Sequence, residues 1–125
     1  MNKEEIKATR PVMPEFDQYV QEIRSIWESG SMTNNGEKVR KFRDMLGDYL
    51  ENPNVEVFVN GHSALLLAIR VMGLQGEVIT SPFTFTSTTN AIIQSGLTPV
   101  FGDIDESYNL NPDGIEELIT DKTSA

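Results

Sequence analysis

Residues 55–69 read Val-Glu-Val-Phe-Val-Asn-Gly-His-Ser-Ala-Leu-Leu-Leu-Ala-Ile. A β-branched run, a break of small residues and a Leu- and Ala-rich run predict a strand over 55–59, a tight turn and a helix over 63–72. The first backbone N–H groups of a helix have no partner within the helix and lie at its positive end, so this turn can bind a phosphate or a carboxylate. Alternatively, Asn60 or Ser63 caps the helix and water satisfies the remaining groups.

The alternation of strand-like and helical stretches continues along the rest of the chain, with glycine and proline between the stretches. The expected strands cover residues 55–59, 78–81 and 100–104, and the expected helices cover residues 63–72, 86–94 and 112–119. Such a β-α-β-α-β-α series predicts an α/β fold with mainly parallel strands and right-handed crossovers. Asn111 is expected to cap the last helix, and residues 120–125 show no stabilising element.

Two helices are expected upstream of this series. Apolar residues recur at spacings of three and four between Phe16 and Trp27, which predicts an amphipathic helix that begins near Pro14 and ends at Gly30. A polar loop follows, and then a second helix whose buried face is expected to hold Val39, Phe42, Leu46, Tyr49 and Leu50. The predicted organisation is an extended arm over residues 1–13, leading helices over 14–54 and an α/β domain over 55–125.

Composition excludes several classes of site and partner. The chain has 125 residues, no cysteine and one histidine, so disulfides, thiolate nucleophiles, cysteine-ligated metals and multi-histidine metal sites cannot form within it. Its formal net charge of −9 disfavours general binding to nucleic acids or anionic membranes. The N-terminus is charged and no apolar run is long enough to span a bilayer, so we expect a cytoplasmic protein.

Ligands of open parallel sheets bind beyond the carboxyl ends of the strands. Three predicted loops lie there, at residues 60–63, 81–84 and 103–107. Phe83 and Phe85 follow a strand directly and stand among hydroxyl side chains. Their rings can stack on a planar ligand, or both can be core residues.

Other polar residues of these loops are open to more than one interpretation. Asp103 and Asp105 can act as a pair of carboxylates in acid/base chemistry, although residues of this kind more often cap or fix a loop. His62 can be a base, a phosphate contact or only a turn residue.

Four stretches of the chain occur in a family-specific order and spacing. They are residues 30–36 (Gly-Ser-Met-Thr-Asn-Asn-Gly), 60–65 (Asn-Gly-His-Ser-Ala-Leu), 76–85 (Gly-Glu-Val-Ile-Thr-Ser-Pro-Phe-Thr-Phe) and 98–105 (Thr-Pro-Val-Phe-Gly-Asp-Ile-Asp). Together they resemble the DegT family of pyridoxal-phosphate-dependent nucleotide-sugar aminotransferases, which have the aspartate-aminotransferase-like fold, fold type I. The resemblance implies that residues 55–125 are part of a cofactor-binding large domain and that residues 30–36 form an active-site loop.

The resemblance also implies roles for individual residues. The turn at Gly61, His62 and Ser63 would offer backbone N–H groups to the phosphate of pyridoxal 5′-phosphate, and Phe85 would stack on its pyridine ring. Thr33 matches a motif near the substrate. Two positions depart from the family pattern, since His62 stands where threonine is usual and Ser31 where an aromatic residue is frequent.

Transamination also needs a lysine that binds the cofactor aldehyde and a carboxylate that keeps the pyridine nitrogen protonated. The family has both beyond the position that matches Ala125, and Lys122 is not that lysine. We therefore expect the chain to be the N-terminal part of such an enzyme, without catalytic residues of its own and with weak cofactor binding at most.

The function implied for the parent protein is transfer of an amino group from an amino acid, with glutamate as the expected donor, to a keto group of a nucleotide-linked deoxysugar. This reaction would serve the biosynthesis of cell-surface polysaccharides or sugars, and the family works as a homodimer with the active site at the interface. The alternative is a catalytically inactive fragment or an interaction domain on the same fold.

Overall fold

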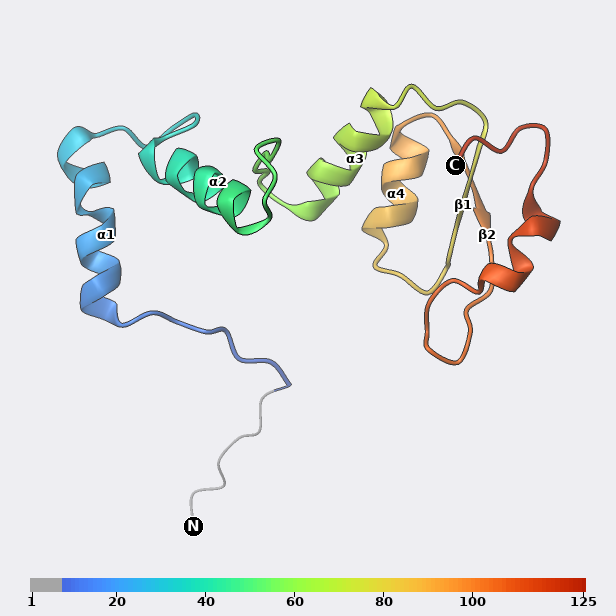
Figure 1. Cartoon of the computed structure of the whole chain (residues 1–125), viewed down its shortest axis with the longest axis horizontal. Helices are drawn as coiled ribbons and strands as arrows, with labels where there is room; N and C mark the ends of the chain where they lie inside the picture. Colours follow the sequence, from blue (N-terminus) through green and yellow to red (C-terminus); the bar gives the residue numbers. More distant parts are fainter. Residues whose placement is uncertain (1–7) are drawn as a thin grey trace, which may run out of the picture. The chain divides into compact units, whose positions relative to one another are not determined.

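The computed structural model describes residues 8–125, and the predicted arm therefore lies partly outside the described residues. The chain divides into two compact units, Met1–Val55 and Glu56–Ala125. The first unit is helical, whereas the second combines helices and strands (Figure 1). The observed fold is α/β with parallel strands, in agreement with the prediction from the sequence.

The first unit contains α1, Phe16–Ser29, and α2, Glu37–Tyr49. Gly30 ends α1 as predicted, because its φ of 63° is in the left-handed region and its N–H bonds to the carbonyl oxygen of Ile26. Lys38 on α2 donates to the carboxylate of Glu22 on α1 over 2.9 Å. This ion pair ties the two helices together.

The prediction of a buried face on α2 is wrong for the described residues. No side chain of α2 is buried, and Phe42 and Tyr49 are 51% and 83% exposed. Two helices form a single layer, and an apolar stripe is buried only when a second layer covers it. The described residues of this unit supply no such layer.

The second unit contains α3, Gly61–Val71, β1, Glu77–Thr80, α4, Ser87–Gln94, and β2, Thr98–Phe101. β1 and β2 pair in parallel, with Glu77 opposite Thr98 and Thr80 opposite Phe101. α3 and α4 lie together on one side of the strands (Figure 1). The buried core consists of Ile69, Ala91, Ile92 and Leu97.

The end of the chain pairs with the free edge of β1, although no stabilising element was expected there. Glu77 N–H donates to the Lys122 carbonyl, Ser124 N–H donates to the Glu77 carbonyl, and Ile79 N–H donates to the Ala125 carbonyl, each over 2.9 Å. Gly76 permits this approach, because a Cβ at its φ of 82° would lie 2.4 Å from the Lys122 oxygen. β1 therefore lies between β2 and residues 122–125.

The expected strand over 55–59 is not formed within the described residues. Val55 and Val57 are half-buried and alternate with more exposed neighbours, so the period of a strand is present. However, the N–H of Val57 bonds to the side chain of Glu56 over 3.0 Å. The hydrogen bond is thus local, whereas a strand needs a ladder with a neighbour.

The expected helix over 112–119 is replaced by two 3-10 helices, η1, Pro112–Gly114, and η2, Glu116–Leu118. Asn111 accepts from Asp113 N–H over 3.0 Å, so the predicted cap is present. Gly114 disfavours helix in the middle of a segment that is too short to propagate one well. The segment lies on the opposite side of the strands from α3 and α4 (Figure 1).

Candidate functional site

The start of α3 combines a side-chain cap with unused backbone donors. Asn60 Oδ1 accepts from Ser63 N–H over 2.8 Å, so Asn60 is the cap and this N–H is not available to a ligand. The N–H groups of Gly61 and His62 have no hydrogen-bond partner within the described residues. The side-chain cap and an anion site are therefore compatible here.

α3 and α4 begin at the same edge of the unit. His62 Nδ1 lies 3.2 Å from the carbonyl oxygen of Ser87, the first residue of α4. At the other end of the pair, Arg70 Nη2 donates to the carbonyl oxygen of Gln94 over 2.9 Å. The two helices are thus parallel, and their positive ends meet beside His62.

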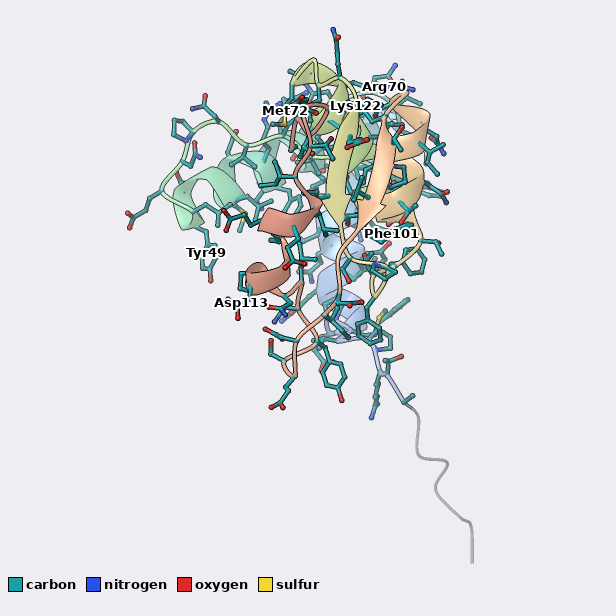
Figure 2. All side chains as sticks on the ribbon, turned by 90° about the vertical axis from the view of Figure 1, so that its right-hand side faces the viewer. Tyr49, Arg70, Met72, Phe101, Asp113 and Lys122 are labelled. Atoms are coloured by element: carbon teal, nitrogen blue, oxygen red, sulfur yellow. The ribbon has the colours of Figure 1, made fainter. Side chains whose placement is uncertain are left out.

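The opposite ends of this unit can be followed in Figure 2. Arg70 and Lys122 are labelled at one end, and Phe101, the last residue of β2, lies toward the other. The carboxyl ends of β1 and β2 therefore share an edge with the starts of α3 and α4 (Figure 1). Because the chain leaves β1 toward β2 and then returns to the other side of β1, the loop after β1 lies at a topological switch point.

The loop after β1 presents aromatic rings at this edge. Phe83 and Phe85 are 62% and 81% exposed, so the alternative that both are core residues is wrong. Residues 82–85 line a pocket of about 340 Å³. Thr84 Oγ1 lies 3.0 Å from Thr88 Oγ1 on α4, which links this loop to the helix that follows.

The loop after β2 is held by its own side chains. Asp105 accepts from the N–H and the hydroxyl of Ser107, and these hydrogen bonds lower the pKa of the Asp105 carboxyl group. Asp105 therefore has the loop-fixing role that sequence reasoning considered the commoner one. The loop also places the Tyr108 ring on the Phe83 ring, with centroids 5.6 Å apart and planes at 30°.

Thr33 belongs to the first unit. It lines a pocket of about 240 Å³ that is formed by the loop before α2 and by parts of α1 and α2. Arg40 on α2 holds this loop by donating to the Asn35 carbonyl over 2.6 Å. Thr33 thus lies on a structured loop, and its assignment to the substrate stays a prediction.

Sequence reasoning missed Ser87, Tyr108 and residues 122–125. His62 contacts the backbone carbonyl of Ser87, 25 residues away in the sequence. Because every residue has such a carbonyl, the residue type of Ser87 does not indicate this contact. Tyr108 gave a weak signal, as an aromatic residue in a polar loop after a strand. The strand-like pairing of residues 122–125 depends on an edge that only the folded chain creates.

Residues 8–125 offer neither a metal-binding cluster nor a membrane-spanning helix. No group of three or more His, Asp or Glu side chains there could hold a metal ion. In the same part of the chain, no helix combines the length and the apolar character that crossing a membrane requires.

Comparison with known proteins gives concordant results in sequence and in structure. Residues 15–125 match the model of the DegT/DnrJ/EryC1/StrS aminotransferase family. Over its whole length, the chain is 38% identical in sequence to the dTDP-4-amino-4,6-dideoxy-D-glucose transaminase of Escherichia coli, and the match covers 34% of that protein. The chain spans about a third of the length of this relative and of a Shigella dysenteriae relative of the same name.

Two solved structures extend the likeness to the fold. DesI, crystallised in the presence of its TDP-sugar product, is 32% identical, with a TM-score of 0.78 over 93% of this chain and 30% of its own. NtdA of Bacillus subtilis, with bound cofactor PMP, is 25% identical, with a TM-score of 0.75 over 98% of this chain and 31% of its own. On the evidence of the family model and of these relatives, the chain belongs to the DegT/DnrJ/EryC1/StrS aminotransferase family.

Proposed function

We propose that this chain supplies part of the cofactor site of a pyridoxal-phosphate-dependent aminotransferase. The reaction is transfer of an amino group, with glutamate as the expected donor, to a keto group of a nucleotide-linked deoxysugar. Family membership supports the reaction class, and the names of the E. coli transaminase and of the DesI structure support a nucleotide-sugar substrate. A relative named as a spore coat polysaccharide biosynthesis protein supports a role in polysaccharide synthesis.

One observation carries the proposal: backbone N–H groups without a partner and the exposed ring of Phe85 lie at the same edge of the second unit. The free N–H groups of Gly61 and His62 suit a phosphate, and the Ser63 hydroxyl is a further donor at the same turn. Phe85 offers an exposed ring beside a pocket, as a pyridine ring requires. The residues present therefore fit pyridoxal 5′-phosphate, which when bound supplies the electron sink for amino transfer.

The residues of this chain bind and orient in this proposal. The positive ends of α3 and α4 attract the phosphate, while Phe85 restricts the plane of the ring. Thr33 and its loop, within the predicted segment 14–54, contact the nucleotide sugar. The reaction also needs a lysine and a carboxylate, and the proposal assigns neither role to a described residue of this chain.

We further propose that the protein acts as a homodimer in the cytoplasm. Large apolar side chains on α1 and α2 remain exposed, with Phe16, Trp27 and Tyr49 at 74%, 79% and 83%. Exposed apolar area of this extent is typical of protein interfaces. A second copy is the occupant that the family resemblance implies, and light scattering that finds only monomer would contradict it.

Titration with pyridoxamine 5′-phosphate tests the cofactor site. We expect the chain to bind it, and Phe85→Ala to weaken binding about tenfold through loss of stacking. The matched control is Ile93→Ala, which removes an exposed apolar side chain of α4 that has no part in the site. Equal effects of the two substitutions would contradict the proposed role of Phe85.

The reaction itself is tested in a protein of the relatives' full length that carries this chain. Mass spectrometry should detect an amino sugar after incubation with glutamate, pyridoxal 5′-phosphate and a nucleotide-linked keto-deoxysugar. A folded full-length protein that binds the cofactor but yields no amino sugar would exclude this substrate class.

A further inference from the structure

We infer that His62 is a positioning residue, which holds the start of α3 against the start of α4 and thereby sets the phosphate-binding turn relative to Phe85. The inference rests on the proposed cofactor site and adds to it a specific role for the His62 side chain. It differs from a phosphate contact through the imidazole, because the atom that acts is Nδ1 and its partner is a protein carbonyl.

The hydrogen bond determines the state of one ring nitrogen. A carbonyl oxygen only accepts hydrogen bonds, so His62 Nδ1, which lies 3.2 Å from the Ser87 oxygen, must carry the hydrogen. The side chain is half-buried, and its partner is the first residue of α4. His62 therefore connects two helix starts, whereas the Asn60 cap acts within α3 alone.

This connection opposes a repulsion that is built into the helix pair. α3 and α4 run parallel, so their positive ends lie side by side and repel each other. Apolar packing through Ile69, Ala91 and Ile92 holds the bodies of the helices together. Their ends are held by two side-chain bonds, from His62 to Ser87 and from Arg70 to Gln94.

The bond of His62 is the one that reaches the ligand edge. Ser87 follows Phe85 by two residues, and the Phe85 carbonyl accepts from Thr88 N–H over 3.1 Å. A shift of Ser87 therefore also shifts the backbone of Phe85. At the other end, Gln94 is the last residue of α4 and has no such connection to the loop after β1.

Three variants of the chain separate positioning from general stabilisation. His62→Ala removes the bond near the site, and Arg70→Ala removes a bond of the same kind at the far end of the same helix pair. His62→Asn retains a donor, because the asparagine amide nitrogen occupies a position similar to that of Nδ1. Binding of pyridoxamine 5′-phosphate is measured by titration, and amide hydrogen exchange of residues 86–90 is measured without ligand.

We expect His62→Ala to weaken pyridoxamine 5′-phosphate binding about tenfold, because loss of the hydrogen bond to Ser87 leaves the phosphate-binding turn less well oriented. Arg70→Ala should change binding by less than about twofold, and His62→Asn should restore most of it. In the unliganded chain, exchange of residues 86–90 should accelerate in His62→Ala and remain slow in Arg70→Ala. Similar effects of His62→Ala and Arg70→Ala on binding, or no restoration by His62→Asn, would overturn the inference.

Hydrogen exchange distinguishes failure of this inference from failure of the proposed function. If no form of the chain binds pyridoxamine 5′-phosphate while exchange at residues 86–90 still responds to His62→Ala alone, the proposed cofactor site fails and the tether between the helices stands. If the unchanged chain binds the ligand but exchange does not respond to His62→Ala, the cofactor site stands and the positioning role is wrong.

Discussion

The two units of this chain use amphipathic helices with different results. In the second unit, α3 and α4 cover a pair of parallel strands, and Ala91 and Ile92 are 0% and 2% exposed. In the first unit, α1 and α2 carry more pronounced apolar stripes than α3 and α4, yet none of their side chains is buried within the described residues. The comparison shows that an apolar stripe on a helix predicts a surface that can be covered, and that only a second layer covers it.

The largest expected effect sharpens this contrast directly. Ile92→Ala should lower the free energy of unfolding by about 3 kcal/mol, because it opens a cavity in the only buried cluster that the described residues form. Phe42→Ala on α2, where the ring is 51% exposed, should cost less than about 0.5 kcal/mol. Urea unfolding followed by circular dichroism measures both. Both values refer to the monomeric chain at low protein concentration, and a loss for Phe42→Ala that grows with protein concentration would report the proposed dimer interface on α2.

The second expected effect concerns the added edge of the sheet. Gly76→Ala should cost about 2 kcal/mol, because a left-handed residue gains a Cβ that meets the Lys122 carbonyl. Gly73→Ala is the matched control, since Gly73 has a φ of 64° with open space around it and should cost about 1 kcal/mol. Faster amide exchange at Ile79 in Gly76→Ala alone would locate the damage at residues 122–125. Equal costs would show that this pairing contributes nothing.

A smaller effect is expected at the helix starts, where the units also differ. Asn60→Ala removes the side-chain cap of α3 and should cost about 1 kcal/mol. Glu15→Ala at the start of α1 should be close to neutral, because Glu15 makes no side-chain cap bond. Thermal unfolding measures the difference. An equal loss of stability in the two variants would contradict this prediction, because it would mean that Glu15 stabilises the start of α1 without a side-chain cap bond.

The smallest expected effect is the pH dependence of the contact between α1 and α2. The hydrogen bond from Lys38 lowers the pKa of the Glu22 carboxyl group. Since the folded-state pKa is lowered, the stabilisation is present above the unfolded-state pKa and disappears as the pH falls through the folded-state value. The Glu22 side chain is solvent-exposed and that of Lys38 is partly exposed, so the effect should be small and should vanish in high salt.

The helical signal as a function of pH, from about pH 7 to about pH 3, tests this contact. We expect a slight loss of helix on acidification in the unchanged chain and none attributable to this pair in Glu22→Gln. An identical acid response of the two forms would show that the ion pair does not contribute.

Local signals predicted most of the elements. Gly30 ends α1 through its left-handed φ, and helices were expected within two residues of the observed bounds of α3 and α4. Asn60 was considered as a cap on its residue type alone, and the structure confirms that role. These features depend on side chains and backbone within a few residues, which a sequence displays directly.

Features that need a distant partner were predicted poorly. Residues 55–59 have the composition of a strand but make no ladder within the described residues, whereas residues 122–125 have little strand character and pair with β1. The exposure of Phe85 could not be read from its type either, because apolar rings after a strand are found both in cores and in sites. The motif order, by contrast, led to the family correctly.

The sequence by itself thus determined the class of fold, the family and the turn at which α3 begins, because helix caps, apolar periods and motif spacing are encoded within short stretches. Only the tertiary structure decided which edge of β1 is paired and that His62 meets Ser87. Each of these depends on two segments that are distant in the sequence, and the contact of α3 with α4 rests on burial of Ile69, Ala91 and Ile92. Burial of this kind is non-directional, so the positions of the hydrogen bonds that form around it emerge only when the segments have packed.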